Sequence, residues 1–159
     1  MIPTLTRQDM KHLLTKLKLA FPFLHSRSAT EEDFYSFCEQ HNIETVFTNL
    51  TSDGIWVLFE GRNYIFLNEK LSGWLLRYVM FHELGHYLFH YPSQSNFGAE
   101  FFSVHGKRKN HHEAETVAAL LLLPPPELHL ALADKEVTYS EEIKNLIGFR
   151  LTLADRYKI

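Results

Sequence analysis

The spacing of apolar residues predicts two helices in the first 40 positions. Between residues 5 and 21, leucine, methionine and phenylalanine recur at intervals of three and four, with lysine and arginine on the opposite side. Pro22 ends this stretch. A second helix is expected from Thr30 to about Gln40, because Thr30 and Asp33 form a capping-box pattern. Each helix then has one apolar face with which to cover a core.

Apolar and polar residues alternate between residues 44 and 68, which is typical of strands with one buried face. Turn residues divide the segment into three short runs. Asp53-Gly54 is a strong two-residue hairpin signal, and Gly61-Arg62 is a weaker one. We therefore expect a three-stranded antiparallel meander, and a sheet that small needs a helix against one face.

Two strongly apolar segments follow, and both are predicted to be helices. Residues 73–90 are apolar nearly all round, as in a buried central helix, with Ser72 as a plausible N-cap and Pro92 beyond its end. Residues 112–123 contain alanines that permit close contact with another helix, and Pro124 follows them. The first of these helices is expected to cover the sheet.

The remaining segments carry weaker patterns. Residues 92–111 are polar and without a period, and a loop of that length is usually functional or disordered. Residues 127–159 predict one or two short helices, one of which opens at Ser140. The chain as a whole is expected to be one α+β domain over residues 1–159, with its core at about 30–124.

Composition narrows the class of protein without naming a function. Apolar residues make up 45% of the chain and charged residues 22%, which is ordinary for a globular domain. The net charge of −3 gives no general attraction to nucleic acid or to a membrane. No apolar run approaches the ~20 residues that a spanning helix needs, and the N-terminus lacks the pattern of a signal peptide.

Cys38 is the single cysteine in the chain. A single cysteine excludes disulfides within the chain and cysteine-rich zinc sites, so any zinc must be held by histidine and carboxylate ligands. One free thiol fits a reducing compartment. We therefore expect a cytoplasmic protein without a membrane segment.

The strongest chemical signal is His82-Glu83-Leu84-Gly85-His86, an H-E-x-x-H pattern within the predicted central helix. Residues four apart lie on one helical face with Cβ atoms about 5–6 Å apart, so two imidazoles can hold one zinc ion. Glu83 then stands where a general base is needed.

The alternative to a metal site is that these are ordinary histidines in a chain with ten of them. Burial of the helix argues against that, because two buried imidazoles would each need a partner. Gly85 also costs about 1 kcal/mol relative to alanine inside a helix, which indicates a close backbone approach at that point.

A catalytic zinc needs three protein ligands and one open position. The candidates for the third ligand are His90, Glu100, His105, His111, His112, Glu113 and Glu115. His90 lies about 12 Å along a straight helix from His82, too far for both to bind one ion with His86. Glu113 is favoured, because it falls in the first turn of the helix at 112–123, where negative charge is stabilised.

Two blocks of the sequence resemble those of the ImmA/IrrE zinc metallopeptidases. Arg77 and the five residues His82–His86 match that family's R-x-x-x-x-HELGH block, and Glu113–Pro124 is similar to its EA-[ND]-x-F-A-x-x-LLMP block. The resemblance covers about residues 30–124. The chain departs from it at three positions that concern packing rather than ligands: Glu115, Val117 and Leu123.

The resemblance implies a zincin-like minimal metalloprotease of the gluzincin type, with one zinc ion per chain. Mapped onto this sequence, it makes His82, His86 and Glu113 the zinc ligands and Glu83 the general base. The candidates for a second-shell or oxyanion role remain His90, Tyr91, His105, His111 and His112, and the sequence does not choose among them.

The resemblance also implies a substrate. Members of this family often cleave a helix-turn-helix repressor encoded nearby, which switches on stress genes or genes of a mobile element. We therefore expect a site-specific endopeptidase that acts on a DNA-binding regulatory protein and has a role in transcription regulation, without binding nucleic acid directly.

Two other functions compete with proteolysis. The chain could be a non-catalytic, zinc-stabilised module that binds and sequesters a repressor or toxin, although a purely structural site has no use for Glu83. Direct DNA binding through the basic helix at 5–21, or through residues 106–109, is opposed by the net negative charge and the lack of a recognition helix. Cleavage fragments would indicate a protease, and a stable complex would indicate a binder.

Overall fold

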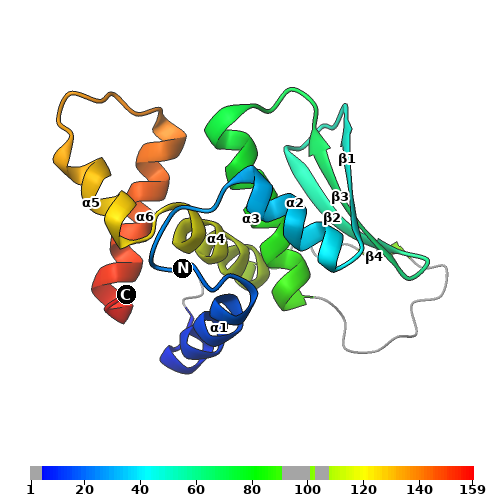
Figure 1. Ribbon diagram of the computed structural model, residues 1–159, viewed down its shortest axis with the longest axis horizontal. Helices are drawn as coiled ribbons and strands as arrows, with labels where there is room; N and C mark the ends of the chain where they lie inside the picture. The colour runs from blue at the N-terminus through cyan, green and yellow to red at the C-terminus, as the bar shows by residue number, and fades with distance from the viewer. Residues whose placement is uncertain (1–4, 91–100, 103–107) are drawn as a thin grey trace. The chain divides into compact units, whose positions relative to one another are not determined.

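The described part of the chain contains six helices and four strands, so the predicted α+β class is confirmed (Figure 1). The computed structural model describes residues 5–90, 101–102 and 108–159. The elements in chain order are α1 (Arg7–Ala20), α2 (Glu31–Gln40), β1 (Ile43–Thr48), β2 (Gly54–Phe59), β3 (Arg62–Asn68), α3 (Gly73–His90), β4 (Phe101–Phe102), α4 (Arg108–Leu122), α5 (Pro125–Ala133) and α6 (Glu141–Tyr157).

The backbone divides into two units. The first contains Thr30–Ala118 and therefore the sheet, α2, α3 and most of α4. The second contains Leu5–Ala29 and Ala119–Ile159, and it is helical.

Helix α2 begins where the sequence predicts. The Thr30 hydroxyl accepts a hydrogen bond from the backbone N–H of Asp33, and the Asp33 carboxylate accepts one from the backbone N–H of Thr30. Thr6 and Asp9 form the same capping box at the start of α1. Each box satisfies amides that the helix itself cannot pair, which fixes the first turn.

The sheet is mixed, and its strand order is β1-β3-β2-β4. β2 and β3 are antiparallel as predicted, but β1 pairs with β3 and runs parallel to it. The antiparallel meander expected from the sequence is therefore wrong at β1. The connection between β1 and β2 crosses the end of β3, where the Asn68 side chain donates to the carbonyls of Leu50 and Ser52.

Gly54 does not make the hairpin that the sequence suggests. A Cβ at this position would lie 2.6 Å from Val79 Cγ1 and 3.2 Å from Glu83 Cγ, so the glycine lets α3 approach β2 closely. The two-residue hairpin is the later one, at Glu60-Gly61, where both residues have positive φ. That backbone conformation is typical of the type I′ turns that join antiparallel strands.

Helices α2 and α3 cover the sheet of the first unit. α3 packs against β2 and β3, and α2 packs against β1 and α3 (Figure 1). Phe34 of α2 meets Phe81 of α3 edge to face, with ring centroids 6.0 Å apart. Seven side chains of this core are completely buried: Phe34, Trp56, Ile65, Leu67, Met80, Phe81 and Leu84. Burial of each such side chain contributes about 1.5–3 kcal/mol to the stability of the fold. Because Met80, Phe81 and Leu84 belong to α3, this helix is firmly held in the core of the unit.

In the second unit the tail predicted at 127–159 forms α5 and the longer α6. This tail supplies a hydrogen-bond donor to the last carbonyls of α4. Arg150 is fully buried, and its Nε donates to the carbonyl of Leu123 at 2.8 Å. The Ser28 hydroxyl donates to the carbonyl of Leu122 at 2.9 Å. These bonds satisfy groups that would otherwise be orphaned at the helix end.

No single helix within residues 5–90, 101–102 and 108–159 is both long and apolar enough to cross a membrane. The consecutive helices α4 and α5 meet that criterion only when they are counted together across their break.

The burial of Cys38 leads to a prediction. Burial raises the pKa of its thiol from the ordinary 9.0 to about 11, and the nearby Thr45 side chain partly opposes that shift. Because the thiolate is the reactive form, we expect iodoacetamide at pH 8 to alkylate the native protein roughly 100-fold more slowly than the urea-unfolded chain. Native stability linked to this neutral thiol is present below pH 9 and declines as the pH rises toward 11. Equal alkylation rates in the two states would contradict this placement of Cys38.

Candidate metal centre

His82 and His86 lie one turn apart on α3 and are both buried, with 6% and 0% of their surface exposed. Their ring centroids are 5.0 Å apart. The two imidazoles therefore share one face of the helix, as the H-E-x-x-H spacing predicts.

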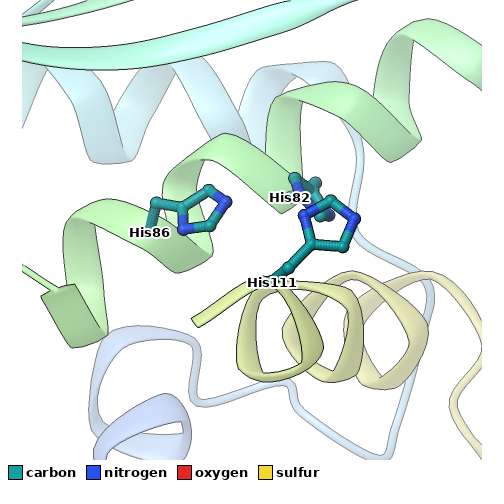
Figure 2. Close-up of side chains that lie close together, drawn as sticks. All are labelled: His82, His86 and His111. Carbon is teal, nitrogen blue, oxygen red and sulfur yellow. The ribbon is translucent and has the colours of Figure 1, made fainter. Parts of the chain in front are cut away.

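Helix α4 brings a third imidazole to this pair. The ring of His111 lies 4.6 Å from that of His82, centroid to centroid, and the three side chains face one another across the two helices (Figure 2). One ring nitrogen from each of His82, His86 and His111 lies within 4.8 Å of the other two. A tetrahedral zinc needs such nitrogens roughly 3.4 Å apart, at bonds of about 2.0–2.1 Å. Imidazole nitrogens are common zinc ligands, and the third one belongs to an exposed side chain, so the chemistry of this donor set fits zinc.

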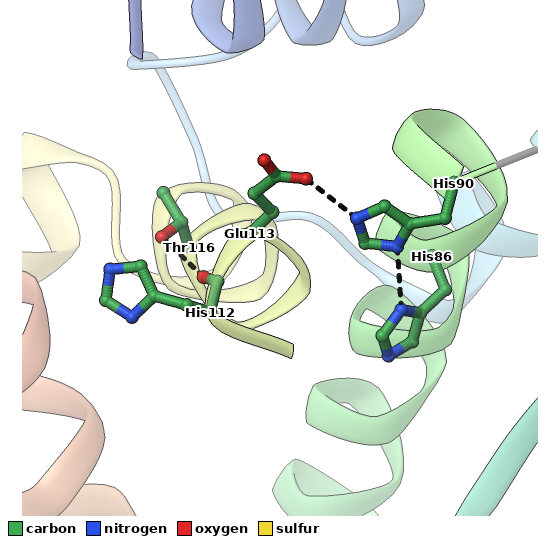
Figure 3. A network of polar contacts seen from close by, with 5 residues as sticks. All are labelled: His86, His90, His112, Glu113 and Thr116. Carbon is green, nitrogen blue, oxygen red and sulfur yellow. Dashed lines mark hydrogen bonds and ion pairs between the residues drawn. The ribbon is translucent and has the colours of Figure 1, made fainter. Parts of the chain in front are cut away.

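Glu113 also reaches this region, but through another side chain. Its Oε2 lies 2.7 Å from Nε2 of His90, and Nδ1 of His90 lies 2.9 Å from Nδ1 of His86 (Figure 3). The His90 and Glu113 side chains are 5% and 16% exposed. The structure thus places Glu113 in a hydrogen-bonded chain that ends on His86, and His111 within the cluster of ring nitrogens.

Glu83 points toward the sheet. The residue is 2% exposed, and its Oε2 accepts a hydrogen bond of 2.9 Å from the backbone N–H of Trp56 on β2. Trp56 is itself held by a bond from its Nε1 to Oδ1 of Asn63. The Trp56 amide lies on the side of β2 where, among the described residues, β4 pairs only with Leu58 and Phe59. The carboxylate next to His82 is therefore fixed at an edge of β2.

Tyr78, which was not among the candidates named from the sequence, also lies beside the cluster. It lies one turn before His82 on α3, and the two ring centroids are 5.8 Å apart. Burial raises the pKa of its phenol, and the carboxylates of Glu115 and Glu83 raise it further. The phenol thus stays protonated and is a hydrogen-bond donor. The spacing of four from His82 was the signal that could have identified it.

Of the other predicted candidates, His112 is described by the structure and does not join the cluster. The ring of His112 lies on the side of α4 away from His86 and His90, and its backbone carbonyl accepts from the Thr116 hydroxyl at 2.8 Å (Figure 3). Tyr91, Glu100 and His105 fall outside the residues that the structure describes.

The two helices of the site touch at Gly85. A Cβ at this position would lie 2.9 Å from the Cα of Ala114 and 3.2 Å from the Cβ of Val117. The close backbone approach indicated by the sequence is confirmed. This contact places the start of α4, with His111 and Glu113, beside the motif on α3.

Comparison with known proteins identifies one family. The sequence model described as Peptidase_M78, IrrE N-terminal-like domain, matches residues 38–159, a span that contains α3, α4 and all the described site residues. No curated protein and no solved structure matches the chain.

The contact at Gly85 can be tested by substitution. Gly85→Ala should destabilise the protein by about 1–3 kcal/mol, because the overpacking outweighs the better helix propensity of alanine. It should also disturb the cluster of His82, His86 and His111, since the two helices must separate. Gly148→Ala on α6 is the matched control, because a Cβ there meets nothing within 4 Å. Urea denaturation should show the control as stable as the wild type or more stable, and a Gly85→Ala protein that behaves like the control would contradict the contact.

Proposed function

The chain belongs to the Peptidase_M78 family of IrrE N-terminal-like domains, and we propose that it is a zinc-dependent endopeptidase. Membership establishes a metallopeptidase type of function. The observation that carries the finer proposal is the convergence of His82, His86 and α4 next to the Glu83 carboxylate. Those are the components that hydrolysis of a peptide bond requires: a metal site, a base and a nearby hydrogen-bond donor.

We assign His82 and His86 as two ligands and Glu113 as the third. Glu113 precedes Ala114, the residue in contact with Gly85, so its backbone lies beside the motif. Its carboxylate is already linked to His86 through His90. His111, whose ring nitrogen is nearer in the described structure, is the competing third ligand.

The bound zinc would supply Lewis acidity toward the scissile carbonyl and acidify the attacking water. Glu83 takes the proton of the water and passes it to the leaving amine. The Trp56 amide holds the Glu83 carboxylate in position for that transfer. Tyr78, with its protonated phenol one turn from His82, is the donor that we assign to the developing oxyanion.

The substrate is proposed to bind as an added strand along β2. The edge of β2 at residues 54–57 has no strand partner on the Glu83 side among the described residues. An extended peptide placed there would run past the base and the metal ligands, held by main-chain hydrogen bonds to groups of this edge other than the Trp56 N–H, which Glu83 already accepts from. We propose that the substrate is a regulatory protein, such as a helix-turn-helix repressor, cleaved in the cytoplasm.

Replacing the base separates chemistry from metal binding. Glu83→Gln keeps an oxygen that can accept from the Trp56 amide, so fold and zinc content should be unchanged. Cleavage of the helix-turn-helix proteins encoded near its gene should fall by about 10²–10⁴-fold, because the proton acceptor is lost. The measurement is fragment formation over time, with chelator-treated wild type as the blank. Full activity in Glu83→Gln would contradict the mechanism, and a stable uncleaved complex with wild type would indicate a sequestering module instead.

The third ligand can be identified from metal content. Wild type should retain one zinc per chain after dialysis, and Glu113→Ala should lose most of it, because two ligands hold zinc weakly. His111→Ala should retain it. Elemental analysis of the three proteins decides the assignment, and the reverse order of loss would make His111 the ligand.

A further inference from the structure

Both ring nitrogens of His90 are in close contact with groups of the proposed zinc site. Nδ1 lies 2.9 Å from Nδ1 of His86, and Nε2 lies 2.7 Å from Oε2 of Glu113 (Figure 3). Both distances are those of good hydrogen bonds. The His90 side chain is 5% exposed, so these contacts are its main polar interactions with the described site. His90 therefore joins one residue of α3 to one residue of α4.

The chemistry of these groups assigns the protons. An ionised carboxylate only accepts hydrogen bonds, so the proton between His90 and Glu113 sits on His90 Nε2. A neutral His90 then has a lone pair at Nδ1. The proton of the second bond must come from His86 Nδ1, which leaves the lone pair of His86 on Nε2. One ring nitrogen of His86 is thereby selected as the one able to bind a metal.

We propose that His90 is a positioning residue that fixes His86 as the Nδ1–H tautomer and holds the Glu113 carboxylate beside it. The inference rests on the proposed zinc site. Metal-binding histidines commonly donate their second ring N–H to a partner that sets the ring's orientation. Here the partner is itself oriented by a carboxylate. This role explains a histidine one turn beyond His86, too far along α3 to bind the same ion as His82.

One other proton arrangement fits the same distances. A doubly protonated His90 would donate to both Glu113 and His86, and His86 would then accept at Nδ1. Neutral His86 would carry its proton on Nε2, and that nitrogen could not bind zinc. The two arrangements differ in the tautomer of His86, which can be observed directly.

The first test uses metal-free wild-type protein labelled with ¹⁵N in its histidines. At pH 8 the ¹⁵N–¹H correlation spectrum should show His86 as the Nδ1–H tautomer. His90→Phe removes both contacts and should release His86 to the Nε2–H form that predominates in free neutral histidine. An Nε2–H tautomer of His86 in the wild type would overturn the proposal.

The second test measures zinc affinity by competition with a chelator. His90→Phe should bind zinc about 10–100-fold more weakly than wild type, the usual effect of losing an outer partner of a ligand. His90→Asn places an amide oxygen where Nδ1 stood, so it should restore the His86 tautomer and part of the affinity. His12→Phe, on the exposed face of α1, is the matched control and should bind zinc like the wild type.

Thermal unfolding of the metal-free variants checks that each one is folded, and the two proposals fail in different ways. If the wild type binds no zinc, the proposed site is wrong. If the wild type binds zinc tightly and folded His90→Phe binds it equally well, the role of His90 alone is wrong.

Discussion

The site depends on the distance between α3 and α4, and a glycine sets that distance. Gly85 lies against the backbone of Ala114, and a single methyl group at residue 85 would come within 2.9 Å of the Ala114 Cα. Because the helices approach this closely, the polar side chains of α3 and α4 come into contact. His82 and His86 from one helix then face His111 from the other, and Glu113 reaches His86 through His90.

The opposite side of α3 is fixed in the same manner. Gly54 on β2 leaves room for Val79 and for the stem of Glu83, and the Trp56 amide holds the Glu83 carboxylate. One helix therefore carries the proposed base on its sheet side and the proposed ligands on its α4 side. Gly85 lies on α3 and Gly54 lies on β2. In each case the missing side chain allows a second element to lie closer to α3: α4 at Gly85 and β2 at Gly54. A buried, nearly all-apolar α3 is what makes such tight packing on two sides possible.

Features that depend on neighbouring residues could be predicted from the sequence, but the pairing of distant strands and helices could not. The capping box at Thr30, the buried helix with its paired histidines and the close approach at Gly85 all follow from interactions within a few residues or from one residue's steric needs. Alternation of apolar residues predicted the strands but not that β1 pairs with β3, because period two specifies a face and not a neighbour. Tyr78 was not named, although its spacing of four from His82 lies within one helix. His90 was named as a second-shell candidate, but its contact with Glu113 could not be predicted, because that contact depends on how α3 and α4 align.

We propose that α3 and α4 together hold one zinc ion with histidine and carboxylate ligands. X-ray absorption at the zinc edge of the zinc-loaded protein tests it most directly, because imidazole rings give a characteristic multiple-scattering signal. We expect a four-coordinate shell of nitrogen and oxygen at about 2.0–2.1 Å, with two imidazoles and one carboxylate from the protein. A shell that contains sulfur, or a six-oxygen shell with no imidazole signal, would contradict the claim.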